Sequence, residues 1–182
     1  MMIRKTKTRS TDESCAAAET EKKVSSMMEF YKEDEKQDVY YFNGDRNNID
    51  YRKDPIFRIR KNKKGYHVTF KKRELSGKTE INTETEFEII NPEKMQDLFF
   101  YMGYEILVDK HKISKVYKYK NANVEINTVK RLGDFIEVEV VAENENQTDD
   151  AIKVINEIFE MLDINEDKIE DRLYIDLLLE GK

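Results

Sequence analysis

The sequence has 182 residues, which suits one domain with a single core, residues 1–182. Its 32 Lys and Arg against 38 Asp and Glu give a net charge of -6, and 38% of the residues are hydrophobic. The charge excludes a uniformly basic protein that coats nucleic acids, and the apolar content excludes a disordered chain. Any site for a polyanion must therefore be local.

Cysteine and histidine are too scarce to support several classes of site. A single cysteine, Cys15, excludes an internal disulfide and a zinc site made of cysteines, and His67 and His111 are the only histidines. No segment approaches the ~18 consecutive apolar residues of a membrane span, and the first residues contain no apolar signal region. We expect a soluble, cytoplasmic protein that does not bind membranes and whose chemistry depends on Glu, Lys and Arg.

Charge is segregated along the chain. Residues 52–78 contain 11 Lys or Arg against 2 acids, and residues 110–131 contain 7 against 1. Residues 134–171 reverse this balance, with 14 acids against 2 lysines. The question for the fold is whether the two basic segments meet in space.

Four helices are expected. The clearest follows Asn91, an N-cap residue before a proline, with apolar residues at i, i+3, i+4 and i+7 and with Gly103 as a C-terminal stop. The others are predicted at about residues 13–28, from residue 148 or 149 onward, and at residues 172–179.

The remaining segments alternate with period two, which is typical of strands with one apolar face. In residues 57–60 Phe57 and Ile59 share one face while Arg58 and Arg60 share the other, and residues 61–65 predict a hairpin turn. We expect six or seven antiparallel strands of this kind. The other polar or charged positions that alternate in this way are Lys71, Glu84, Glu86, Glu88, Lys110, Lys112, Glu125, Asn127, Glu137 and Glu139.

Two interpretations of these charged faces are open. A sheet with one solvated face also alternates, and this needs no function. However, each strand carries a doublet of one sign, whereas a merely solvated face tends to mix signs. If the sheet closes, basic strands could bind a polyanion, and acidic strands could hold a divalent cation that contacts its phosphates.

The order of the motifs resembles the CYTH superfamily, the triphosphate tunnel metalloenzymes, which include class IV adenylate cyclases and thiamine triphosphatases. It is closest to the class IV adenylate cyclase-like branch. The segments that carry the resemblance are residues 37–43, 57–60, 68–71, 86–88 followed by the helix at 91–103, 110–112 with 116–117, 132–139 and 171–179. None of them is diagnostic alone. Their order and spacing are specific.

The resemblance implies an α+β fold: an eight-stranded antiparallel tunnel, closed as a barrel from two sheets, with helices packed outside. It implies an enzyme that acts on a nucleoside triphosphate, thiamine triphosphate or inorganic polyphosphate with Mg²⁺ or Mn²⁺, and it allows a homodimer. The implied phosphate-binding residues are Arg58, Arg60, Lys71, Lys110 and Lys112. The implied metal ligands are Glu137 and Glu139, with Glu86 and Glu88 as further acidic residues of the tunnel, and Lys7 is the implied catalytic residue.

One motif departs from the family pattern. The family's opening strand reads Glu-x-Glu-x-Lys, but residues 3–7 keep only Lys7 and have Ile3 and Lys5 in place of the acids. A literal match at residues 19–23 leaves too few residues before Asp38 for an outer helix, so we expect the opening strand at residues 3–7. Because the lost carboxylates should weaken metal binding, a weakly active or inactive phosphate-binding module is an alternative to the enzyme. A general RNA-binding protein is a third, disfavoured by the net charge.

Overall fold

The computed structural model describes residues 2–7, 15–44, 56–76, 79–141, 147–165, 169–170 and 172–181, with side chains from residue 19 onward except in 71–76 and 79–82. Within these ranges the strands are β1 (Met2–Lys7), β2 (Glu29–Phe42), β3 (Ile56–Asn62), β4 (Gly65–Ser76), β5 (Thr79–Ile89), β6 (Glu105–Tyr119), β7 (Ala122–Val129) and β8 (Gly133–Val141). The helices in the same ranges are α1 (Cys15–Met27), α2 (Pro92–Tyr101), α3 (Thr148–Met161) and α4 (Tyr174–Glu180).

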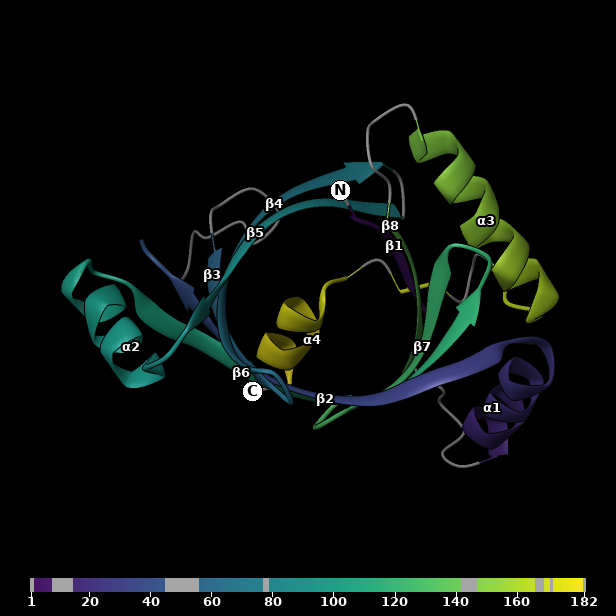
Figure 1. Cartoon of the computed structure of the whole chain (residues 1–182), viewed down its shortest axis with the longest axis horizontal. Coiled ribbons are helices and arrows are strands. Elements are labelled where there is room, and N and C mark those ends of the chain that lie inside the picture. Colours follow the sequence, from purple (N-terminus) through teal and green to yellow (C-terminus); the bar gives the residue numbers. More distant parts are fainter. Residues whose placement is uncertain are drawn as a thin grey trace.

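The strands form one antiparallel ladder in the order β1-β5-β4-β3-β2-β6-β7-β8. Because β1 pairs with β5 on one side and with β8 on the other, the ladder returns to its start as a barrel (Figure 1). Residues directly opposite each other in a ladder project to the same face, so the register determines which side chains meet inside. The predicted α+β class with antiparallel strands is confirmed.

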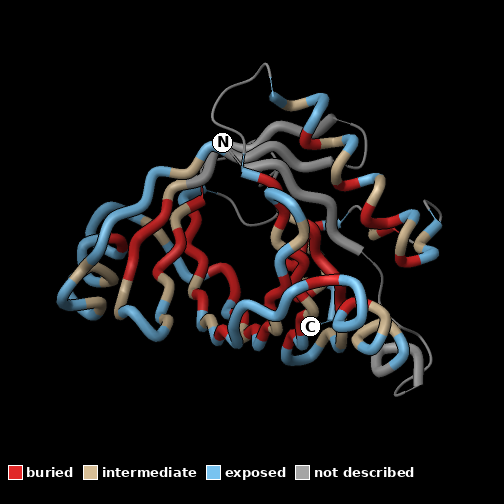
Figure 2. Tube along the Cα trace, turned by 45° about the vertical axis from the view of Figure 1, so that its right-hand side comes forward, coloured by how far each residue is buried: buried red, intermediate tan, exposed pale blue. Residues whose placement is uncertain are grey.

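The inner face of the barrel is polar and the outer face is apolar. On β7, Val124 is fully buried against the helices outside, whereas the neighbouring Glu125 belongs to the inner face and is only 4% exposed. The strand period of two produces this division, because successive side chains point to opposite faces. Figure 2 shows many of the buried positions on the strands. The barrel therefore buries charged groups inside and places most of its hydrophobic packing outside.

Helices α1 and α3 cover the outer face of β7 and β8 (Figure 1). Val24 of α1 and Ile155 and Ile158 of α3 belong to one buried cluster with Val124 and Val138 of the sheet. The predicted start of α3 near residue 148 is confirmed.

Helix α2 covers the outer face of β2, β3 and β4. Its N-cap is Asn91, whose Oδ1 accepts a hydrogen bond from the backbone N–H of Lys94 at 2.9 Å. Phe99 packs on Tyr41 of β2, with 5.0 Å between the ring centroids. Gly103 follows the helix with φ of +83°, the left-handed conformation that favours glycine. The predicted helix boundaries at Asn91 and Gly103 are confirmed.

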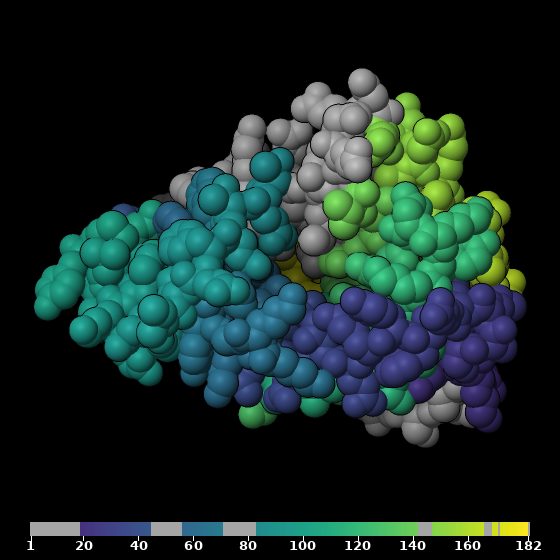
Figure 3. Space-filling model, in the orientation of Figure 1, coloured from purple at the N-terminus to yellow at the C-terminus, as the bar shows by residue number. Residues whose placement is uncertain are grey.

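Helix α4 covers one end of the barrel. Ile175 and Leu178 pack against Tyr40, Ile56 and Val108, which lie near the ends of β2, β3 and β6. In Figure 1, α4 lies within the outline of the barrel, and in Figure 3, which has the same orientation, a small part of the C-terminal segment is visible at the bottom of a hollow. The sequence predicted this helix but placed all helices outside the barrel. Helix α4 lies across the barrel end instead, because its apolar face and the apolar side chains at these strand ends bury each other.

Candidate functional site

Four of the five predicted phosphate-binding residues lie together on the inner face. Arg58 and Arg60 on β3 flank β2 on one side, and Lys110 and Lys112 on β6 flank it on the other. Their side chains are 3%, 15%, 6% and 5% exposed. The fifth, Lys71, is opposite Ile56 in the ladder, and its side chain lies outside the described part. The two basic segments of the sequence therefore do meet.

Asp38 on β2 lies between two of these cations. Its carboxylate accepts hydrogen bonds from Arg60 Nε at 2.6 Å and Nη2 at 2.8 Å, and Oδ2 is 3.0 Å from Lys110 Nζ. Burial alone would raise the pKa of Asp38, but the positive charges of Arg60 and Lys110 hold the pKa well below its usual value. Asp38 was not among the predicted site residues. The available signal was that Asp38 and Tyr40 lie two residues apart on one strand and therefore share a face.

Lys110 is also enclosed by aromatic rings. Its Nζ donates to the hydroxyl of Tyr40 at 3.0 Å and lies 5.5 Å from the ring centroid of Tyr40 and 5.3 Å from that of Tyr174. Such contacts stabilise a cation with little access to water. Because Tyr174 belongs to α4, the helix that covers the barrel end also contacts a cation of the site.

Arg58 combines full burial with an unused donor. Its Nη2 donates to Thr69 Oγ1 at 2.8 Å and to Glu86 Oε2 at 3.4 Å, and it lies 3.6 Å from Glu84. Its Nε is buried and has no hydrogen-bond partner among the described residues. A buried donor without a partner is costly, so this atom is suited to an anionic ligand that enters the barrel.

Lys112 holds two carboxylates together. Its Nζ lies 2.7 Å from Glu125 Oε2 and 2.7 Å from Glu137 Oε2. The two glutamates are directly opposite each other on β7 and β8. Asn127 Nδ2 donates to Glu137 Oε2 at 2.7 Å, and Ser114 Oγ donates to Asn127 Oδ1 at 2.6 Å. All five side chains belong to buried residues, so the group forms one polar network inside the barrel.

The four predicted metal ligands have different environments. Glu137 is fully buried in the network of Lys112, and Glu139 follows it on the inner side of β8, opposite Asn123. Glu86 and Glu88 lie on β5, and β1 separates that strand from β8. The side chain of Glu88 is 81% exposed. Among the described residues no group of three His, Cys, Asp or Glu is placed to hold a metal ion.

Carboxylate oxygens are nevertheless present where a divalent cation could use them. Glu125, which was not among the predicted ligands, contributes one and Glu137 the other, and oxygen ligands of this kind are those that Mg²⁺ and Mn²⁺ prefer. The ammonium of Lys112 contacts both. The donor set therefore fits a divalent ion once this ammonium has moved away.

The opening strand has the predicted location. Residues 2–7 form β1, whereas residues 19–23, the literal match to the family motif, belong to α1. In the pairing of β1 with β8, Lys7 is opposite Ile136, and Arg4 and Thr6 are opposite Glu139 and Glu137. The side chains of β1 lie outside the described part, so the role of Lys7 stays a prediction.

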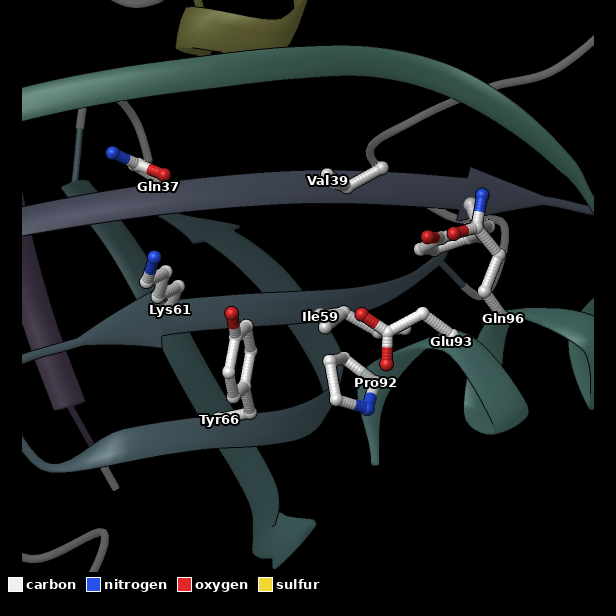
Figure 4. A pocket seen from close by; sticks show the side chains of 9 residues that line it. Gln37, Val39, Ile59, Lys61, Tyr66, Pro92, Glu93 and Gln96 are labelled. Atoms are coloured by element: carbon white, nitrogen blue, oxygen red, sulfur yellow. The ribbon is translucent and has the colours of Figure 1, made fainter. Parts of the chain in front are cut away.

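A second cavity lies outside the barrel, between α2 and strands β2, β3 and β4 (Figure 4). It has a volume of about 270 Å³, and the polar residues at its wall are Gln37, Lys61, Tyr66, Glu93 and Gln96. With one lysine and one glutamate its charges balance, whereas the inner face concentrates buried cations. The inner face is therefore the better candidate for an anionic ligand.

The comparison with known families identifies the chain. Residues 2–174 match the model of the CYTH domain. The chain belongs to the CYTH family. Of the described helices, none combines the length and the apolar character needed to cross a bilayer.

Relatives of this CYTH chain include curated and structurally solved proteins. A "putative adenylate cyclase" of Methanocaldococcus jannaschii is 29% identical over 82% of this chain and 85% of that protein. The structure of a Pyrococcus horikoshii protein, PH1012, is 25% identical with a TM-score of 0.79, and covers 98% of this chain and 99% of its own. A "putative adenylyl cyclase" from Hippeastrum, described as having a dominant triphosphatase activity, is 15% identical with a TM-score of 0.69 over 100% and 97% of the two chains. This last likeness shows the fold alone.

Proposed function

We propose that the chain is a metal-dependent enzyme that binds the phosphate chain of an organic triphosphate inside the barrel and hydrolyses it. The observation that carries this proposal is the convergence of Arg58, Arg60, Lys110 and Lys112 on the inner face with side chains at most 15% exposed. Buried cations are costly unless an anion compensates them. In the ligand-free barrel Asp38, Glu125 and Glu137 provide these anions. A phosphate chain could replace them, because guanidinium groups match its oxygens in a bidentate manner.

Each cation of the site would have a distinct task. Arg58, with its unpartnered Nε, would bind phosphate oxygens without first giving up that donor. Arg60 and Lys110 would bind phosphate oxygens either beside the Asp38 carboxylate or after their contacts with it have broken. Helix α4 would exclude water from its end of the barrel, which strengthens every charge interaction inside.

We infer that Mg²⁺ or Mn²⁺ binds at Glu125 and Glu137, with Glu139 as a further predicted ligand. When bound, such an ion neutralises charge on the phosphate oxygens and orients them. Asn127 would keep the Glu137 carboxylate in place through its hydrogen bond at 2.7 Å.

Hydrolysis is favoured over cyclisation because it requires recognition of the phosphate chain alone. The described inner face offers charged and small polar groups that recognise phosphates. Cyclisation of ATP is the alternative reaction, because the Methanocaldococcus jannaschii relative is described as a "putative adenylate cyclase".

A binding module without efficient catalysis is the second candidate. Asp38 already occupies Arg60 and Lys110, and the opening strand has Ile3 and Lys5 where the family motif has acids. The first leaves less positive charge for a triphosphate, and the second leaves the opening strand, residues 2–7, without any acidic residue for a metal ion. The cations that bind phosphate could therefore persist in a chain that has lost catalysis.

A product assay with matched binding measurements tests the proposal. ATP, thiamine triphosphate and tripolyphosphate are each supplied with Mg²⁺ or Mn²⁺, and phosphate, pyrophosphate and cyclic nucleotide are measured. We expect phosphate release by the wild type and its loss in Arg58→Met, while Arg131→Met, a change at a half-exposed arginine outside the inner face, leaves it unchanged. Calorimetric binding without turnover would select the binding module. No binding of any of the three would refute both candidates.

A further inference from the structure

The position of Lys112 bears on how a metal could enter the site. Its ammonium contacts Glu125 and Glu137 at 2.7 Å each, although its own partners in the ladder are Lys36 and Val129. The lysine therefore reaches diagonally to Glu125 on the paired strand β7 and over β7 to Glu137 on β8, rather than to its directly opposite neighbours.

The two carboxylates need this cation. They lie opposite each other at 4% and 0% exposure, and like charges at such a position repel strongly in the absence of water. Burial alone would raise the pKa of Glu125, but Lys112 and Lys36 outweigh it and lower the pKa. The same carboxylates, opposing its burial, raise the pKa of Lys112. Both directions are those of a charged pair, and the ammonium of Lys112 lies between the two glutamates.

The Glu137 carboxylate would keep its orientation if the ammonium left. Asn127 holds the Oε2 atom of Glu137 at 2.7 Å, and Ser114 fixes the amide of Asn127 from the other side at 2.6 Å. Neither contact involves Lys112. A cation that replaced the ammonium would find the Glu137 oxygen already oriented, which is the condition for a preorganised metal site.

A metal and the ammonium cannot share this place. Mg²⁺ binds carboxylate oxygens at about 2.1 Å, and it would use the same Oε2 atoms that Lys112 contacts. Two adjacent positive charges repel each other strongly when little water screens them. Lys112 has a flexible four-carbon stem, and Lys110 lies two residues away on the same face of β6, so the ammonium can turn toward a phosphate chain held there.

We propose that Lys112 is a resident counter-ion, which keeps divalent cations away from Glu125 and Glu137 until an anionic phosphate ligand draws its ammonium aside. This inference rests on the proposed function for the identity of that ligand. It predicts that metal binding follows phosphate binding, and that the ligand-free protein has little affinity for divalent cations.

The first test titrates Mn²⁺ into the ligand-free protein by calorimetry, in buffer free of phosphate. The wild type should show no binding at millimolar Mn²⁺, whereas Lys112→Gln should bind one Mn²⁺ at least roughly tenfold more tightly. Lys115→Gln is the matched control, because that half-exposed lysine of the same strand pairs with Glu21 and touches neither glutamate, and it should behave as the wild type. Equal Mn²⁺ affinity in the wild type and Lys112→Gln would overturn the proposal.

Loss of a buried cation could destabilise Lys112→Gln, so thermal unfolding provides a second readout. Mn²⁺ should raise the Tm of Lys112→Gln and leave that of the wild type unchanged, because a ligand that binds only the folded state stabilises it. The double variant with Glu137→Gln should lose this gain. A Tm of Lys112→Gln that does not respond to Mn²⁺ would count against the counter-ion.

The role of the phosphate ligand is tested separately, with tripolyphosphate in EDTA. Glu125→Gln releases one restraint on Lys112 and should tighten metal-free tripolyphosphate binding by several-fold relative to the wild type, and unchanged or weaker binding would refute release of the ammonium by phosphate. If tripolyphosphate does not bind to the wild type at all, the proposed function fails. The comparison with Mn²⁺ alone then still decides whether Lys112 occupies a metal position.

Discussion

Asp38 accepts two hydrogen bonds from the guanidinium of Arg60, from Nε at 2.6 Å and from Nη2 at 2.8 Å. This fork-to-carboxylate geometry is the one in which arginine also binds phosphate. The barrel therefore carries an anion of its own inside the proposed phosphate clamp. That anion both stabilises the ligand-free fold and competes with the ligand.

Replacing Asp38 should separate these two effects. Asp38→Asn leaves Arg60 and Lys110 buried without their anion, so we expect the free energy of unfolding to fall by about 3 kcal/mol. Tripolyphosphate should bind more tightly to the variant, because the two cations no longer have an internal competitor. Urea unfolding and calorimetry measure the two quantities.

Asp109→Asn is the control for this prediction, since Asp109 pairs with Arg131 through a side chain that is 71% exposed. Exposed pairs contribute little, so its effect on unfolding should stay below about 1 kcal/mol. Weaker tripolyphosphate binding by Asp38→Asn would contradict the competition between Asp38 and phosphate.

The contribution of Asp38 should vanish in acid. Burial raises its pKa, but Arg60 and Lys110 together hold the pKa well below the usual 3.8. A carboxyl group with a depressed folded pKa contributes stability that is complete above the unfolded pKa and is lost as the pH falls through the folded pKa. The difference in unfolding free energy between wild type and Asp38→Asn should thus be constant above about pH 5 and shrink below pH 3.8. A difference that does not change with pH would show that the ion pair is not its source.

Metal-dependent turnover should depend on the acidic residues of β8. Glu137→Gln and Glu139→Gln each remove a charge while preserving shape, so turnover should fall roughly 100-fold while the fold survives. Without metal, both variants should bind tripolyphosphate at least as tightly as the wild type, because a carboxylate inside the barrel repels phosphate. Phosphate release with varied Mn²⁺ measures the first effect.

A matched glutamate on the surface controls for the loss of charge. Glu157 of α3 forms an ion pair with Lys120 at 2.6 Å and lies outside the barrel, so Glu157→Gln should leave turnover unchanged. If Glu137→Gln and Glu139→Gln also keep their turnover and metal dependence, neither residue belongs to the site.

The packing of α4 on the barrel end should be important for stability. Leu178→Ala removes a side chain that is 2% exposed and packs near Tyr40 and Ile56, and it should lower the free energy of unfolding by about 2 to 5 kcal/mol. Leu98→Ala, at a position of α2 that is 47% exposed, should cost less than about 1 kcal/mol. Equal losses in the two variants would mean that α4 is not packed as described. Chemical denaturation measures both.

Local patterns predicted the elements of this fold well. Alternation at Arg58 and Arg60 is a property of neighbouring residues, and the cap at Asn91 needs only the next three residues, so both can be read from a short window. The inner face of β3 and the start of α2 follow from such windows. The same is true of the hairpin turn between Asn62 and Gly65.

The partners of the inner charges could not be predicted in this way. Lys112 reaches Glu125 and Glu137 across two strand pairs, and which residues meet there depends on the stagger of the closed ladder. Asp38 was missed for the same reason, since its partners Arg60 and Lys110 come from two different strands. Alternation gives the face of a residue, but not the strand order and register that decide which side chains of neighbouring strands become its partners.

Helix α4 limits how a ligand can enter and leave the barrel. Because Ile175 and Leu178 pack across one end of the barrel, the hollow in Figure 3 is closed at its bottom and open at one end. Under the proposed function, a linear substrate would enter and its products would leave by the same opening, so a polymer could not pass through the barrel. A long polyphosphate could then be shortened only from its terminus, and each cleavage would require a separate binding event.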